Sequence, residues 1–165
     1  GKPAYFRIRD MHKDIVKIRA SASLPLVSRN VKIGSGLYLD GGLIDSIPIQ
    51  RSILDGNRKN VVIMTKERSF VRRRIKGYML WLLRARYWRY PKVAELMAHR
   101  DTRYREQVTY VERLRKSGKA FVIRPKAASG VGRVEKDAKK LWALYRQGYR
   151  DAAESYQDLL TFLEK

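Results

Sequence analysis

The sequence contains no cysteine and only two histidines. The absence of cysteine excludes disulfide bonds and cysteine-ligated metals, and it fits a reducing compartment. The histidines, His12 and His99, are isolated from each other and do not make a metal site, so we expect neither a metal nor another cofactor. Hydrophobic residues make up 44% of the 165 residues, which is enough for an ordinary packed core.

The chain also lacks a long hydrophobic run. The longest candidate, GYMLWLL at residues 77–83, is closed by Arg84 and is far shorter than the roughly 20 residues that span a bilayer. A secretory leader is not visible either. We therefore expect a cytoplasmic protein with no transmembrane segment, one that reaches a membrane only by peripheral contact.

Acidic residues are scarce relative to basic ones. The sequence has 16 Asp and Glu against 37 Lys and Arg, which gives a formal net charge of +21. Residues 66–124 alone hold 18 basic residues and 5 acids. Such a field attracts polyanions, and either nucleic acid or an anionic membrane surface would satisfy it.

The first part of the chain alternates between strand and helix signals. We predict a strand over residues 5–9, a helix capped by Asp10 and ending near Ala20, and a short strand over residues 37–39. A helix should begin at Pro48 and end near Asp55. The apolar run VVIMT at residues 61–65 is typical of a strand covered on both faces in a parallel sheet. This order predicts an α/β fold.

The second part is mainly helical and basic. We predict an amphipathic helix over residues 69–86, with an apolar stripe of Val71, Ile75, Tyr78, Met79 and Leu82. A second helix should cover residues 92–116 and end at Gly118. A strand over residues 120–124 follows. Two final helices, one with a stripe of Val134, Ala138, Leu141 and Tyr145, should separate near Gly148. The fold should thus be helix-rich with few strands.

The stretch GLYLDGGLIDSIPI at residues 36–49 places one carboxylate, Asp40, at the end of a short strand and before two glycines. Gly41 and Gly42 carry no Cβ, so a ligand or another backbone segment could approach the carboxylate closely. A simpler alternative is a turn in which Asp40 binds its own following amides, because Asp-Gly is a common turn pair. Local sequence favours the turn.

The wider succession RASASLPL, YLDGGLIDSIPIQRSILDG and VVIMTK resembles the patatin-like phospholipase family, most closely its bacterial branch. Ala20, Ser21 and Pro25 match an Ala-Ser-x-x-x-Pro turn of that family, and Asp40 begins its Asp-Gly-Gly element. The resemblance implies a three-layer α/β/α fold and a lipid acyl hydrolase with a Ser-Asp dyad. By this resemblance Asp40 is the catalytic base, and Gly41 and Gly42 support it. The family pattern does not fix a role for Asp45, which we interpret as an acid near the start of the helix at Pro48.

The Gly-x-Ser-x-Gly elbow and the glycine-rich oxyanion loop of that family do not occur in residues 1–165. We therefore expect this chain to be the C-terminal portion of a longer enzyme. Residues 1–65 would be the part of the catalytic domain that carries the Asp-Gly-Gly element, and residues 66–165 would be a basic helical region that completes it. The fragment alone should be inactive, and surface bared by truncation should favour self-association.

The basic middle combines cationic and aromatic side chains, which suits the headgroup boundary of an anionic bilayer where a lipid hydrolase meets its substrate. The candidates for membrane contact are Arg72, Arg73, Arg74, Lys76, Trp81, Arg84, Arg86 and Trp88. Alternatively, the aromatic stripe packs internally and the arginines are solvated. A further alternative is a non-catalytic basic module that binds nucleic acid or membrane, although no nucleic-acid-binding motif is evident.

Overall fold

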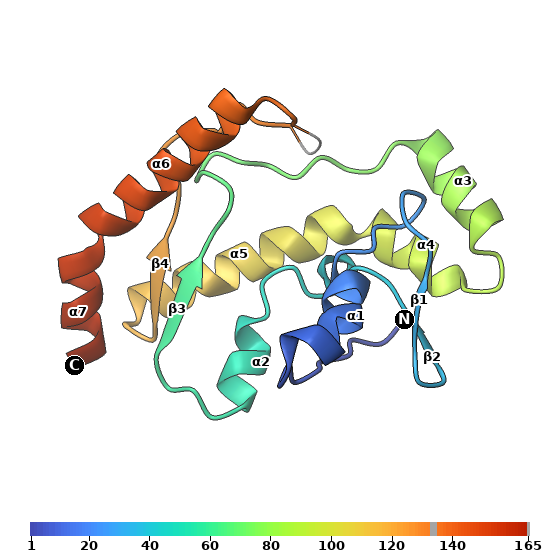
Figure 1. The fold of residues 1–165 in the computed structure, drawn as a ribbon, viewed down its shortest axis with the longest axis horizontal. Coiled ribbons are helices and arrows are strands. Elements are labelled where there is room, and N and C mark those ends of the chain that lie inside the picture. The colour runs from blue at the N-terminus through green and yellow to red at the C-terminus, as the bar shows by residue number, and fades with distance from the viewer. Residues whose placement is uncertain (133–134, 165) are drawn as a thin grey trace. The chain divides into compact units, whose positions relative to one another are not determined.

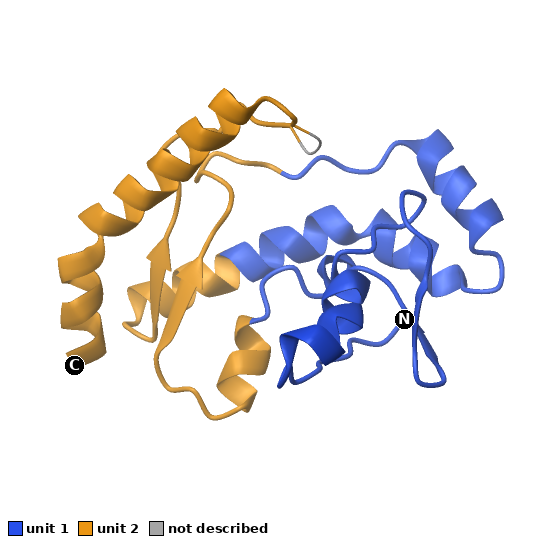
Figure 2. Ribbon diagram, in the orientation of Figure 1, with its two compact units in different colours: residues 1–48, 72–108 blue, residues 49–71, 109–165 orange. Residues whose placement is uncertain are grey.

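The computed structural model describes residues 1–132 and 135–164, and within them the protein is helix-rich with a few short strands (Figure 1). The expected mixed α/β character is therefore confirmed. The chain forms two compact units, each built from two separate stretches of sequence (Figure 2). The expectation that residues 1–65 and 66–165 are two parts of one catalytic domain stays a prediction.

Unit 1 consists of residues 1–48 and 72–108. Its elements are α1 (Met11–Ser21), β1 (Val31–Ile33), β2 (Gly36–Tyr38), the 3-10 helix η1 (Gly41–Leu43), α3 (Gly77–Arg86), α4 (Pro91–Ala98) and the first half of α5 (Arg100–Lys116). The strands β1 and β2 pair antiparallel as a hairpin, with Val31 opposite Tyr38. The sequence predicted the second strand but not its partner.

Helix α1 begins where its capping signal places it. The Asp10 carboxylate accepts hydrogen bonds from the backbone N–H groups of His12 and Lys13, which lack partners inside the helix. The strand predicted at residues 5–9 is wrong, because this stretch contains neither helix nor strand. An alternating pattern alone does not make a strand where no neighbouring strand supplies hydrogen bonds.

The core of unit 1 forms between α3 and α4. Leu83, Tyr87 and Ala94 are buried, and Ile75, Leu80 and Met97 are among the half-buried residues that pack against them. The predicted stripe is partly confirmed: Ile75 and Met79 are half-buried, whereas Val71, Tyr78 and Leu82 are exposed.

Helix α3 also begins at Gly77, eight residues later than predicted. Arg72 and Lys76 would stand one turn apart in a longer helix, with Arg73 also adjacent to Lys76, and like charges at that spacing oppose helix formation.

The predicted helix over residues 92–116 is divided into α4 and α5. Arg103 of α5 donates to the carbonyl of Leu96, which lies in the last turn of α4, where carbonyls have no partner within the helix. Gly118 follows α5 with a φ of 70°, as expected of a glycine that ends a helix.

Unit 2 consists of residues 49–71 and 109–165, of which residues 133, 134 and 165 are not described. Its elements are α2 (Ile49–Leu54), β3 (Asn60–Ile63), the second half of α5, β4 (Ala120–Ile123), α6 (Ala138–Glu154) and α7 (Tyr156–Glu164). The strands β3 and β4 pair parallel, with Val62 beside Val122. The strands and their parallel pairing agree with the sequence prediction.

Burial along β3 alternates, which differs from the prediction of a strand covered on both faces. Asn60 and Val62 are buried, whereas Val61 is 42% and Ile63 is 72% exposed. Because neighbouring side chains of a strand point to opposite faces, this alternation shows that only one face of the strand is covered.

The final helices separate at Ser155 and not at Gly148, which lies inside α6. A glycine within a helix costs only about 1 kcal/mol relative to alanine, so a helix with a good cap continues through it. The cap is Asp137, whose carboxylate accepts from the N–H groups of Lys139 and Lys140. Val134, the first residue of the predicted stripe, lies outside the described residues.

Candidate functional site

Asp40 lies two residues after the end of β2 and caps η1. Its backbone N–H donates to the carbonyl of Ser23 at 2.8 Å, and its Oδ1 accepts from the N–H of Gly42 at 2.6 Å. The turn predicted from the Asp-Gly pair is therefore present. This bond fixes the direction of the carboxylate, so a structural role in the turn and a chemical role for the same side chain are compatible.

The two glycines face different surroundings. A Cβ on Gly42 would stand 2.9 Å from Asp40 Oδ1 and 3.3 Å from Arg100 Nη2, whereas a Cβ on Gly41 would meet nothing nearer than Ser21 Oγ at 3.9 Å. A side chain at position 42 would therefore displace the Asp40 carboxylate or the end of the Arg100 side chain. Gly41 leaves free space beside the carboxylate.

Two arginines of α5 hold the backbone of this turn. Arg100 Nε donates to the carbonyl of Gly42 at 2.9 Å, and Arg103 Nη2 donates to the carbonyl of Leu43 at 3.0 Å. The arginines lie one turn apart on the same helix face. Sequence reasoning missed both, because nothing in the local sequence relates them to residues about 60 positions earlier.

Gln107, one further turn along α5, binds the segment that follows η1. Its amide nitrogen donates to Asp45 Oδ1 at 2.8 Å, and its amide oxygen accepts from the N–H of Ser46 at 3.1 Å. The hydroxyl of Tyr5 donates to Asp45 Oδ2 at 2.5 Å. Asp45 is therefore a cross-linking residue and does not act at the start of α2, which begins only at Ile49.

A pocket of about 390 Å³ opens beside Asp40, entirely within unit 1. Its lining includes Asp40, Gly41 and Ser21, the apolar side chains of Phe6, Leu37, Leu39, Ile44 and Leu96, and the cationic side chains of Lys17 and Lys92. The pocket is large enough for a small organic ligand. The two motifs that carry the family resemblance, at Ala20-Ser21 and at Asp40-Gly41, meet at its wall.

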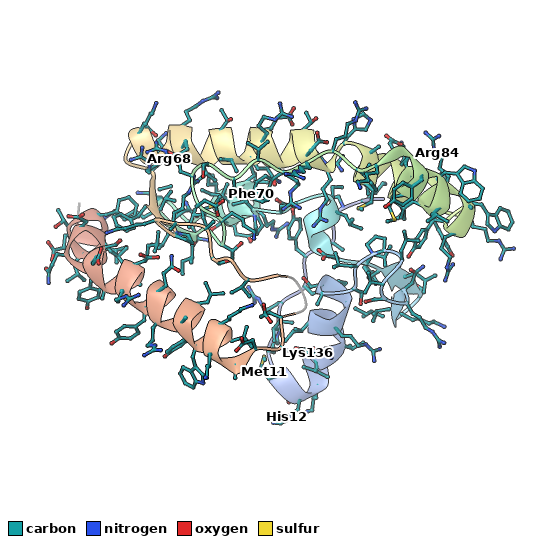
Figure 3. The ribbon with its side chains drawn as sticks, turned by 90° about the horizontal axis from the view of Figure 1, so that it is seen from above. Met11, His12, Arg68, Phe70, Arg84 and Lys136 are labelled. Atoms are coloured by element: carbon teal, nitrogen blue, oxygen red, sulfur yellow. The ribbon has the colours of Figure 1, made fainter. Side chains whose placement is uncertain are left out.

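Seven of the eight candidates for membrane contact are accessible to a partner. Arg72 is half-buried and its guanidinium lies 4.4 Å from the centre of the Tyr104 ring, so we no longer expect it to contact a membrane. The other seven candidates, namely Arg73, Arg74, Lys76, Trp81, Arg84, Arg86 and Trp88, are exposed. Figure 3 labels Arg84 on α3, where its side chain projects away from the ribbon.

In unit 2, Glu112 is the centre of a group of arginines. Burial alone would raise the pKa of Glu112, but the hydrogen bond from Arg115 and the charges of Arg115, Arg124 and Arg68 lower it below its usual range. The shortest of these contacts is Arg115 Nε to Glu112 Oε2 at 2.8 Å. This group joins α5 to the carboxyl end of β4.

Residues 1–132 and 135–164 contain no group of three or more His, Asp and Glu side chains placed to hold a metal ion. Over the same residues, no helix is long and apolar enough to cross a bilayer.

Comparison with known proteins relates the second part of the chain to a described family. Residues 90–164 match the family described as "Domain of unknown function (DUF6363)". The matched range includes Arg100, Arg103 and Gln107 as well as α6 and α7, so it draws on both units. No curated protein matches the chain. The second part of the chain is thus similar to a domain family whose description states no function.

Proposed function

We propose that this chain is the C-terminal part of a patatin-like serine acyl hydrolase with a three-layer α/β/α fold, in which Asp40 is the general base. The observation that carries the proposal is the position of Asp40, which is oriented by Gly42 and lies on the wall of the 390 Å³ pocket. A largely apolar pocket beside a fixed carboxylate suits an ester with a hydrophobic acyl chain.

In this mechanism a serine outside residues 1–165 attacks the ester carbonyl while Asp40 accepts the proton of its hydroxyl. The tetrahedral intermediate expels the alcohol, which takes the proton back from Asp40. Water then attacks the acyl-enzyme while Asp40 accepts one of its protons. Collapse of the second tetrahedral intermediate releases the carboxylic acid, and the serine oxygen takes that proton back from Asp40. Asp40 must lie within hydrogen-bond distance of the serine, and backbone N–H donors must stabilise the oxyanion.

The test compares two aspartates in the complete gene product. We expect Asp40→Asn to lower hydrolysis of a p-nitrophenyl ester by about 100-fold or more, because it removes the base. Asp45→Asn is the matched control, since Asp45 is five residues away, is held by Tyr5 and Gln107, and does not line the pocket. The 165-residue chain alone should not hydrolyse the ester. Equal activity of the Asp40→Asn and native proteins would refute the proposal.

A second candidate function is supported by exposed aromatic residues on α3 and in the turn that follows it. Trp81 is 67% and Trp88 is 72% exposed, and both stand among exposed arginines. These side chains suit an anionic bilayer surface, with nucleic acid as the rival partner. Flotation with anionic and with neutral vesicles, beside a single-stranded DNA mobility shift at matched salt, separates the two. A tight DNA shift without flotation would defeat the membrane alternative.

A further inference from the structure

Helix α6 is amphipathic, but its apolar side does not face the rest of unit 2. The side chains that pack against the rest of the unit, at least in part, are Leu144, Gln147, Asp151 and, just beyond the helix, Ser155. The aromatic residues Trp142, Tyr145 and Tyr149 are 62%, 62% and 69% exposed. Ring-bearing side chains project from the free side of α6 in Figure 3.

The exposed apolar residues form one continuous stripe. Ala138, Leu141, Trp142, Tyr145, Tyr149 and Ala152 follow the spacing of three and four residues that places side chains on one helix face. All of them are exposed. The stripe therefore runs along nearly the whole length of the 17-residue helix, with no described residue of unit 2 covering it.

A row of cations borders this stripe. Lys139, Arg146 and Arg150 share the adjacent helix face and are exposed. The two acids of α6 lie elsewhere, because Asp151 is half-buried and Glu154 pairs with Lys126. The accessible side of α6 is therefore apolar at its centre and positive along one border.

We propose that α6 docks in the plane of an anionic lipid bilayer, with its Leu141–Tyr149 stripe in the acyl boundary and its basic row on the headgroups. Helices that lie in a membrane interface combine such an apolar face with lysine and arginine beside it. Tryptophan and tyrosine are the side chains enriched at the headgroup level, because each has an apolar ring and a polar tip. The proposal extends beyond the hydrolase and does not depend on it.

The same observations argue against other occupants of this face. A second copy would bring two basic rows together, in a chain with a formal net charge of +21, and like charges oppose such a contact. Trp142 and Tyr145 meet edge to face, with ring centres 5.5 Å apart and planes at 85°. The edge of one ring thus covers a face of the other, which reduces the ring surface that bases of single-stranded nucleic acid could stack on.

The chain has three tryptophans, which allows a direct test. In a Trp81→Phe/Trp88→Phe variant of the full chain, Trp142 is the sole tryptophan. We expect vesicles that contain phosphatidylglycerol to shift its emission to shorter wavelength, and brominated acyl chains to quench it. Pure phosphatidylcholine vesicles should have little effect, because the basic row then has no anionic partner.

A matched pair of substitutions in this background tests the stripe itself. Tyr145→Glu places a charge within the apolar stripe, and Ala143→Glu places the same charge on an exposed position of the polar side. We expect Tyr145→Glu to lower vesicle binding about ten-fold more than Ala143→Glu does, because it removes apolar area as well as adding charge. Circular dichroism checks that both variants are folded.

Three outcomes would overturn the proposal. Trp142 emission that stays unchanged while the protein sediments with the vesicles would show that another surface binds the lipid. A shift that depends on protein concentration without lipid would assign the face to a second copy, and a shift on single-stranded DNA would assign it to nucleic acid. A failure of this test leaves the Asp40 comparison unaffected, so the two proposals are distinguishable.

Discussion

The Asp-Gly-Gly turn allows two adjacent glycines to be compared by the same substitution. In Gly42→Ala the new methyl carbon would stand 2.9 Å from Asp40 Oδ1 and 3.3 Å from Arg100 Nη2, so the turn or the arginine must move. In Gly41→Ala the nearest atom is Ser21 Oγ at 3.9 Å, an ordinary contact. Neither glycine has a positive φ, so the two variants differ in steric surroundings and not in backbone strain.

The expected magnitudes follow from these contacts. The atoms that the new methyl group would meet are the ends of two side chains and can shift, but moving Asp40 Oδ1 breaks the 2.6 Å hydrogen bond that it accepts from Gly42 N–H. We therefore expect Gly42→Ala to lower the free energy of unfolding by about 0.5–1.5 kcal/mol, the usual net contribution of one hydrogen bond. Gly41→Ala should leave the free energy of unfolding unchanged or raise it by up to about 1 kcal/mol, because alanine restricts the unfolded chain.

Urea unfolding of the 165-residue chain, followed by circular dichroism and tryptophan fluorescence, measures both variants. The urea concentration at the midpoint of unfolding should fall only for Gly42→Ala. The slope of the free energy of unfolding against urea concentration should stay the same in both variants. Equal losses in the two variants, or a larger loss for Gly41→Ala, would refute the geometry described for this turn. In the complete gene product Gly41→Ala should still weaken ester binding, because Gly41 lines the pocket.

Further predictions concern the core and the surface. Leu83→Ala should lower the free energy of unfolding by about 2–5 kcal/mol, because Leu83 is fully buried, whereas Leu82→Ala should cost far less, as urea titration will show. The pKa of Asp14 is lowered from 3.8 to about 2 by hydrogen bonds from Lys17 and backbone amides, so its contribution to stability is complete above about pH 4 and is lost as the pH falls through about 2. Asp14→Asn should remove this contribution, so the free energy of unfolding of the variant should fall less than that of the native protein as the pH is lowered from about 4 to about 2. Gly118→Ala should destabilise the chain by about 1 kcal/mol, because its φ of 70° is unfavourable for alanine.

The sequence predicted those elements whose signals are local. Asp10 caps α1, Gly118 follows the end of α5, and the apolar runs of β3 and β4 form parallel strands. It failed where tertiary contacts decide the outcome. The apolar stripe predicted around α3 includes Leu82 in place of Leu83, because the two residues are adjacent in sequence and only packing against α4 selects Leu83.

The candidate site likewise combines features that local sequence predicts with features that depend on tertiary contacts. The position of Asp40 near the end of a strand and its turn with Gly42 could be predicted from the residues next to it in the sequence. The arginines that hold the turn could not, since Arg100 and Arg103 are 58 and 60 positions from the carbonyls they bind. A contact at such separation leaves no mark in the composition or periodicity of either segment.

Each unit is built from two separate stretches of sequence, and this affects how the chain folds during synthesis. Unit 1 needs residues 72–108, yet residues 49–71 of unit 2 leave the ribosome before them. Within the part of the chain that the structure describes, β3 pairs with β4 alone, so nascent β3 lacks this partner until residues 120–123 emerge. An apolar strand without its partner is a target for chaperones. The many cations near it in the sequence oppose aggregation of the incomplete chain.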